Sequence, residues 1–342
     1  MNLPTAAPET LAPWLQQQLS TLLLQRGHAR LLSGPSGLGQ YSLALALARA
    51  WLCDQAHADG ACGHCTSCHA IDVRTHADLC VLMPETVMLD LGWPLPEKAQ
   101  SDIDDKKRKP SKEIRVDAMR DAVEFAQRTS ARGRGKVVLI FPAERMNHIT
   151  ANALLKTLEE PAGDVRFVLA SEAAHQLLPT IRSRCQVHAM TWLPEQESLI
   201  WLNLQGVPGD AAKTLLRAAG SRPEDALRHA NTGLDARMWS ALPKALAQGQ
   251  TSAVKDWPAV LLVDALQKVC HDLMVRSVGG QPRFFDVHDL PSAPSFEKLA
   301  AWGRSLIQEM RTVEHPYSAG LMTEALMAQA QGTMNSLSGQ SK

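Results

Sequence analysis

Four cysteines lie within a short stretch of the chain and could bind a metal ion. The pattern C-x8-C-x2-C-x2-C is formed by Cys53, Cys62, Cys65 and Cys68. Four thiolates can close a tetrahedral Zn²⁺ site, and the short spacings let neighbouring sulfurs reach one ion without straining the backbone. Because four protein sulfurs leave no open coordination position, we predict a structural zinc module over residues 53–68.

Other assignments of this cysteine group remain open. An iron–sulfur cluster is the main rival, but a ferredoxin run needs one more Cys followed by Pro, and this chain has Ile71, Asp72 and Val73 at that point. Reduced free thiols or a different metal are the remaining alternatives. A substitute ligand could come from His57, His64, His69 or Cys80. The two other cysteines, Cys185 and Cys270, are expected to be buried apolar residues.

A glycine-rich stretch resembles a phosphate-binding loop that has lost its polar side chains. The apolar pair Leu31–Leu32 precedes Gly34, Gly37 and Gly39, and a helical pattern of Leu and Ala follows. In a P-loop, G-x-x-x-x-G-K-[ST], backbone N–H groups surround the phosphates, the Lys contacts the β and γ phosphates, and the hydroxyl binds Mg²⁺. Here Gln40 and Tyr41 stand where the Lys and the hydroxyl residue belong.

The acidic residues that complete such a site are also missing. An ATPase of this class needs a strand that ends in Asp, and often Glu, to hold Mg²⁺ and orient water. The candidate strand, residues 136–141, runs instead into Phe141 and Pro142, which cannot bind metal. We therefore predict that the chain does not hydrolyse ATP or bind it productively, with weak residual binding as the alternative. The glycines would then serve a tight turn between strand and helix.

Composition limits the classes of protein that are possible. The 342 residues are 45% hydrophobic and 20% charged, which is typical of a globular protein with two or three domains. Lys plus Arg and Asp plus Glu both number 35, so there is no overall basic field that would draw the chain onto nucleic acid. The N-terminus lacks the features of a signal peptide, and no apolar window of about 18 residues suggests a membrane span. We expect a cytoplasmic protein.

Two kinds of pattern divide the chain. Up to about residue 190, strands alternate with helices, which predicts an α/β domain with a largely parallel sheet. Strands are expected at 136–141 and 165–170. Beyond residue 190 only helical patterns remain, and the last three helices are expected at 258–278, 295–315 and 318–337.

The helix between those two strands has a clear apolar face. Its apolar positions have helical spacing, with Asn147 as candidate N-cap and Pro161 just after the end. They are Ala151, Leu154, Leu155 and Leu158. Residues 94–113, by contrast, mix prolines with charges of both signs and predict a mobile surface loop of unknown role. Its basic run 106–109 is interpreted as solvated, with phosphate contact as the alternative.

The order of these motifs resembles one known family. The degenerate GPSGLGQ, the four-cysteine insertion, ANALLKTLEEP at 151–161 and IRSRC at 181–185 are similar, in this order, to bacterial clamp-loader subunits of the AAA+ family. The lost nucleotide residues make the chain most similar to the delta-prime subunits of DNA polymerase III. The segments at 24–32 and 314–327 extend the resemblance over the whole chain.

The resemblance implies three domains. These are a RecA-like AAA+ domain with the zinc module at residues 1–190, a small helical lid domain at 191–233, and an all-α collar domain at 234–342 that oligomerises. It also implies partners: gamma or tau and delta subunits in a hetero-pentameric ring, which loads the β sliding clamp on primed DNA during replication. No membrane partner is expected.

The resemblance also gives a role to the motif Ser183-Arg184-Cys185. It implies that Arg184 is an arginine finger, which reaches the γ-phosphate of ATP bound by a neighbouring subunit. Arg182 is the nearby alternative. In the lid, Arg222 lies one position out of register with the arginine by which relatives sense their own nucleotide, so it receives no such role. Residues 94–113 look like an insertion relative to the family.

Two other classes of function remain as alternatives. An independent P-loop-type ATPase with atypical loop residues predicts ATP turnover by the isolated chain. A zinc-dependent nucleic-acid-binding protein predicts a salt-dependent DNA affinity of the chain alone.

Overall fold

The computed structural model describes residues 11–254, 257–313 and 319–335. The chain forms two compact units, which meet in the sequence between Trp192 and Leu193. The finer division into domains at 1–190, 191–233 and 234–342 stays a prediction. Part of the predicted family segment at 314–327 lies outside the described residues, because 314–318 are not described.

The first unit is built on a parallel sheet, as predicted. Its strands are β1 (Ala29–Ser33), β2 (Leu79–Leu82), β3 (Lys136–Ile140), β4 (Val165–Ser171) and β5 (Gln186–Ala189). Their order across the sheet is β2-β3-β4-β1-β5, and each neighbouring pair is parallel. The strands expected at 136–141 and 165–170 are thus confirmed as β3 and β4.

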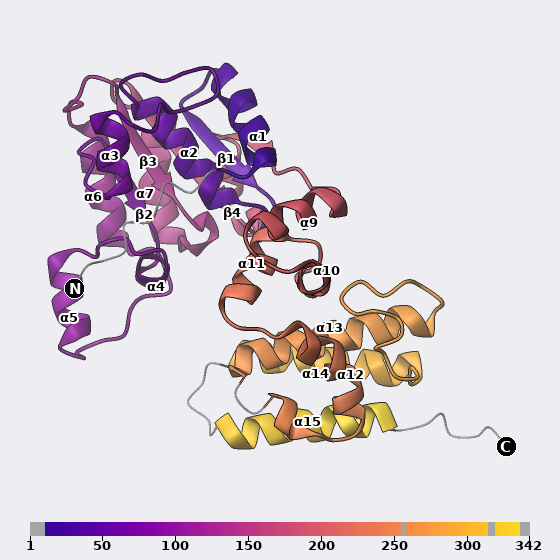
Figure 1. The fold of residues 1–342 in the computed structure, drawn as a ribbon. Coiled ribbons are helices and arrows are strands. Elements are labelled where there is room, and N and C mark those ends of the chain that lie inside the picture. Colours follow the sequence, from indigo (N-terminus) through magenta and orange to yellow (C-terminus); the bar gives the residue numbers. More distant parts are fainter. Residues whose placement is uncertain (1–10, 255–256, 314–318, 336–342) are drawn as a thin grey trace. The chain divides into compact units, whose positions relative to one another are not determined.

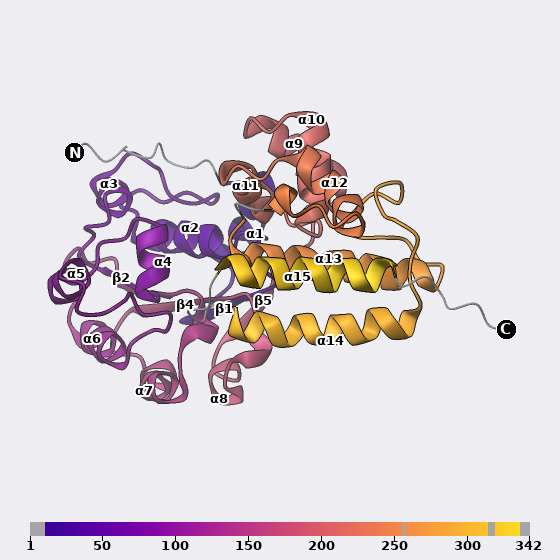
Figure 2. The same ribbon diagram turned by 90° about the horizontal axis from the view of Figure 1, so that it is seen from below.

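Helices cover both faces of this sheet (Figure 2). The α-helices of the unit are α1 (Pro13–Leu24), α2 (Gln40–Leu52), α3 (Thr66–Asp72), α4 (Glu85–Asp90), α5 (Glu97–Asp104), α6 (Val116–Gln127), α7 (His148–Glu159) and α8 (Pro179–Arg182). Helices α1 and α2 lie on one face, and α6, α7 and α8 lie on the other. On the second face, Leu31, Val138 and Phe167 from three strands join one buried apolar cluster.

Helix α7 forms as its sequence pattern predicts. The Asn147 side chain accepts a hydrogen bond from the backbone N–H of Thr150 at 3.0 Å, which satisfies one of the free donors at the start of the helix. Leu154 and Leu158 on its apolar face are buried against the sheet. The helix ends at Glu159, before the predicted stop at Pro161.

Residues 94–113 lie at the surface as predicted, but they are not a loop throughout. Helix α5 occupies Glu97–Asp104, and the segment after it is tied to the unit by Arg108. The Arg108 guanidinium binds the buried Glu85 carboxylate, at 2.8 Å from Nη2 to Oε1, and the backbone N–H of Ser111 donates to the same carboxylate. Arg108 is the main cause that lowers the pKa of Glu85. An ion pair with a residue outside the segment thus orders part of the charged insertion.

In the described part of the second unit, every regular element is a helix (Figure 1). Its α-helices are α9 (Glu195–Leu204), α10 (Gly209–Ala218), α11 (Pro223–Asn231), α12 (Ala236–Ala247), α13 (Ala259–Ser277), α14 (Phe296–Thr312) and α15 (Ala319–Asn335). The last three confirm the predicted helices, although the expected ends at 314–315, 318 and 336–337 fall outside the described residues. None of the helices in the described ranges is both long and apolar enough to cross a membrane.

Candidate functional site

The glycine-rich loop connects β1 to α2, and its backbone conformation favours glycine at two positions. Gly37 and Gly39 have φ angles of 76° and 91°, in the left-handed region that favours glycine. Gly39 is also the N-cap of α2. The loop shape therefore depends on these glycines whether or not a phosphate is bound.

Gln40 closes this loop from the inside. Its side chain is 2% exposed, and its Nε2 donates to the carbonyl oxygens of Gly34 at 2.8 Å and Pro35 at 2.6 Å. One neutral amide thus links the first residue of α2 to the start of the loop. Because unpaired buried carbonyls destabilise a fold, these bonds hold the loop without a charged ligand.

Aromatic side chains stand where the hydroxyl and acidic residues of an ATPase would lie. The rings of Tyr41 and Phe141 are 5.4 Å apart between centroids. The Tyr41 hydroxyl accepts a hydrogen bond from the indole N–H of Trp93 at 2.7 Å, and the Arg74 guanidinium lies 5.0 Å from the Trp93 ring centroid. The structure brings Tyr41 and Phe141 together. Sequence reasoning missed Trp93 and Arg74, because no local motif marks them.

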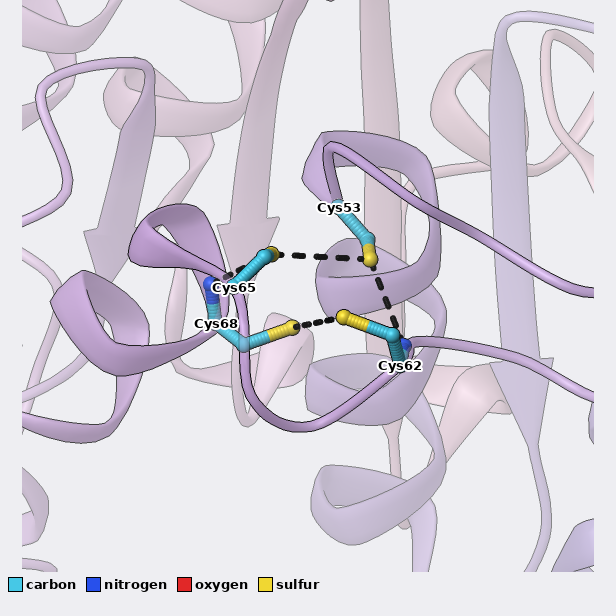
Figure 3. A group of neighbouring side chains, drawn as sticks. All are labelled: Cys53, Cys62, Cys65 and Cys68. Carbon is cyan, nitrogen blue, oxygen red and sulfur yellow. Dashed lines mark hydrogen bonds between the residues drawn. The ribbon is translucent and has the colours of Figure 1, made fainter.

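The four predicted cysteines form one group (Figure 3). Their sulfur atoms all lie within 4.8 Å of one another. The Sγ–Sγ distance is 3.7 Å between Cys53 and Cys65 and 4.0 Å between Cys62 and Cys68. A tetrahedral ion with Zn–S bonds of about 2.3 Å needs sulfurs about 3.8 Å apart. The donors present therefore fit a four-sulfur metal site.

Two short elements position these sulfurs. Cys53 caps the C-terminus of α2, and Cys65 caps the N-terminus of α3. Backbone N–H groups point at the sulfurs, with Cys62 N to Cys53 Sγ at 3.3 Å and Cys68 N to Cys65 Sγ at 3.4 Å. Such bonds stabilise thiolates, the form that binds metal. Among the described residues, the group does not include the proposed substitutes His57, His64, His69 and Cys80.

The polar contacts around the group hold α3 in place. The Asp54 carboxylate accepts from Ser67 Oγ at 2.8 Å and from Thr66 Oγ1 at 3.2 Å. These bonds, led by Ser67, lower the pKa of Asp54. From outside the module, the Arg132 guanidinium donates to Thr66 Oγ1 at 2.9 Å. The polar side chains around the cysteine group thus hydrogen-bond to one another, and the four sulfurs face one another.

The predicted arginine lies on a separate part of the sheet. Arg184 follows α8 and precedes β5. Its guanidinium donates to the Glu159 carboxylate, with Nε to Oε1 at 2.6 Å, and to the Thr180 carbonyl oxygen from Nη1 at 2.9 Å. In the same motif Cys185 is buried, which raises its pKa to about 12, and Ser183 Oγ donates to Thr180 O at 3.2 Å. Burial of Cys185, and of Cys270 in the second unit, agrees with their prediction as apolar core residues.

Arg184 and the glycine-rich loop are at opposite ends of two neighbouring strands. Strands β1 and β5 are adjacent and parallel, with Arg30 beside Gln186 and Ser33 beside Ala189. The loop follows the carboxyl end of β1, whereas Arg184 precedes the amino end of β5. At about 3.3 Å per strand residue, the paired strands separate them by at least about 10 Å. Arg184 therefore does not lie beside the loop of its own chain.

Comparisons with known proteins show the family to which the chain is similar. The family model described as DNA polymerase III, delta subunit, matches residues 9–193, which is more than half of the chain. A Pseudomonas aeruginosa protein named DNA polymerase III subunit delta' is 40% identical over 220 residues, or 63% of this chain and 60% of the relative.

Two Escherichia coli proteins are also similar. DNA polymerase III subunit delta' is 32% identical over 277 residues, or 75% of this chain and 76% of the relative. DNA polymerase III subunit tau is 32% identical over 185 residues, or 52% of this chain and 25% of the relative. The chain belongs to the DNA polymerase III delta-prime family.

Proposed function

We propose that this chain is a clamp-loader subunit that does not hydrolyse ATP itself and completes the ATP site of a neighbouring subunit through Arg184. The separation of Arg184 from its own loop carries this proposal. An arginine at the opposite end of the neighbouring strand can act as a finger only on the nucleotide of a second chain. Family membership supports a place in a clamp loader.

The chemistry of phosphoryl transfer explains why such a subunit can lose its own site. A trans arginine stabilises the charge that develops on the transferred phosphoryl group, and it needs no phosphate-binding loop in its own chain. In the loop, Gln40 and the Tyr41–Phe141 contact replace the Lys, hydroxyl and acidic groups that ATP and Mg²⁺ require. The loop then serves the shape of the unit and binds no ATP productively.

The partners follow from the family. We propose gamma or tau and delta subunits in a five-membered ring, joined through the helical collar, which places the β sliding clamp on primed DNA in the cytoplasm. The lid and collar would be residues 191–233 and 234–342. The four cysteines would hold a structural Zn²⁺ that fastens α3 to the end of α2, as the sulfur spacing supports.

The test is the steady-state ATPase of a reconstituted clamp loader that contains either the parent chain or Arg184→Ala, with clamp and primed DNA present. We expect the isolated chain to be inactive and the variant assembly to turn over ATP more slowly than the parent. Arg182→Ala is the matched control, since Arg182 is an exposed arginine of the same segment.

Three results would contradict the proposal. ATP turnover by the isolated chain would support an independent ATPase instead. An Arg184→Ala assembly that forms and works like the parent, with a slower Arg182→Ala assembly, would move the finger to Arg182. Salt-dependent DNA binding by the chain alone would favour a zinc-dependent nucleic-acid-binding protein.

A further inference from the structure

We propose that Glu159 is a positioning residue for Arg184, which holds the finger against its own subunit until a neighbour's nucleotide competes for it. The inference rests on the proposed function of Arg184. It concerns a residue that no sequence motif marked as functional, although Glu159 lies inside the ANALLKTLEEP stretch.

The contacts of Arg184 leave little of its guanidinium free. Nε donates to Glu159 Oε1 at 2.6 Å, and Nη2 binds the same oxygen. Nη1 donates to the carbonyl oxygen of Thr180 at 2.9 Å. All three nitrogens therefore have partners within the subunit. A guanidinium held in this way must give up at least part of these bonds to reach a phosphate on another chain.

The pair is placed so that it can open. Glu159 is the last residue of α7, and Arg184 lies two residues beyond the end of α8, so neither belongs to the packed centre of the unit. The side chains are 47% and 30% exposed, respectively. Because both reach solvent, separating them does not leave a buried charge unpaired, which is the costly step in breaking a buried ion pair.

Charge decides which partner holds the arginine. An exposed carboxylate pair is weak and screened by salt, whereas a triphosphate in a closed interface carries more negative charge in a less polar setting. Without a neighbour's ATP the carboxylate holds the guanidinium; with ATP the phosphate takes it. The finger is then available only in the fraction of molecules in which the pair is open, and this fraction scales the apparent rate.

The neighbouring residue supplies a matched control. Glu160 follows Glu159 directly, is exposed, and its carboxylate has no hydrogen bond or ion pair with other described residues. Glu159→Gln and Glu160→Gln change the net charge equally, at adjacent positions. Only the first weakens the hold on Arg184.

The experiment measures ATPase in the reconstituted clamp loader at subsaturating ATP, without clamp or DNA. Parent, Glu159→Gln, Glu160→Gln, Arg184→Ala and the Glu159→Gln/Arg184→Ala pair are compared, with thermal unfolding as a check of folding. We expect Glu159→Gln to raise turnover by about two- to fivefold, the range for an exposed ion pair. Glu160→Gln should match the parent, and the gain should shrink at high salt.

The double variant separates the inference from a general structural effect. If Glu159 acts through the finger, Glu159→Gln changes nothing once Arg184 is Ala. Unchanged or lower turnover in Glu159→Gln, or a gain that persists without Arg184, overturns the role of Glu159 while a slow Arg184→Ala assembly still upholds the proposed function. An Arg184→Ala assembly that works like the parent contradicts the proposed function itself.

Discussion

Helix α2 connects two candidate ligand sites that differ in the groups they offer to a ligand. At its N-terminus, Gly39 begins the helix at the end of a loop shaped for phosphate. At its C-terminus, Cys53 ends the helix as the first member of a four-sulfur group. The same 13-residue helix therefore connects a glycine-rich loop without the side chains of a P-loop to a group of four cysteines that fits a metal ion.

The difference lies in what satisfies the polar atoms. In the loop, the Gln40 amide pairs with backbone carbonyls and the Tyr41 hydroxyl pairs with Trp93, so internal partners replace the ligand. In the cysteine group, the four sulfurs face one another at distances that fit one metal ion. We therefore expect the loop to keep its shape without a ligand and the cysteine group to depend on a metal.

The largest effect is expected from removing the metal. Treatment with a strong chelator, or Cys62→Ser, should lower the free energy of unfolding by about 4 kcal/mol if the free metal had been at about 1,000 times its Kd. Differential scanning calorimetry with metal analysis would measure this change. Cys80→Ser is the control, because Cys80 is outside the group and should leave the metal content unchanged. A parent that contains no metal and is stable without it would remove the contrast between the two ends of α2.

A smaller loss of stability is expected when the Gln40 side chain is removed from the loop. Gln40→Ala removes two buried hydrogen bonds and leaves the carbonyls of Gly34 and Pro35 without this donor, at a cost of about 1–3 kcal/mol. Urea unfolding would measure it. The metal content should stay at the parent level, since the cysteine group is at the other end of the helix. Unchanged stability would mean that the amide does not replace a ligand.

A single hydroxyl tests the aromatic contact. Tyr41→Phe keeps the ring against Phe141 but leaves the Trp93 N–H without this acceptor, so we expect a loss of about 1 kcal/mol. Trp93→Phe and the double variant complete a thermodynamic cycle in urea unfolding. Losses that simply add would show that the hydroxyl and the indole are not coupled.

No gain is expected from restoring two of the lost residues. Gln40→Lys with Tyr41→Ser rebuilds the P-loop pattern, yet Phe141 and Pro142 still cannot hold Mg²⁺. The isolated double variant should show no ATP hydrolysis in a phosphate-release assay. Measurable turnover would show that the missing acidic residues are not decisive. Two substitutions in the loop would then be enough to restore ATP hydrolysis.

Local patterns predicted elements of the first unit well where the spacing of apolar residues or a capping side chain marks the element. The capping of α7 by Asn147 and the strand over residues 136–140 follow from period and cap chemistry. The helix within residues 94–113 was not predicted, and neither was the ion pair of Arg108 with Glu85, 23 positions earlier. A mixed-charge sequence looks the same whether or not such a partner exists.

By itself the sequence determined which chemical groups are present: four cysteines at metal-binding spacing, and a loop without its lysine, hydroxyl and acids. These are matters of residue type and local spacing, which the chain carries directly. Only the tertiary structure decided which groups meet. Trp93 reaches Tyr41 across 52 positions and Glu159 reaches Arg184 across 25, because the packing of helices and strands, rather than local spacing, brings them into contact. The parallel pairing of β1 with β5 likewise placed Arg184 and the loop at opposite ends of these two strands, since pairing within a sheet is set by long-range contacts.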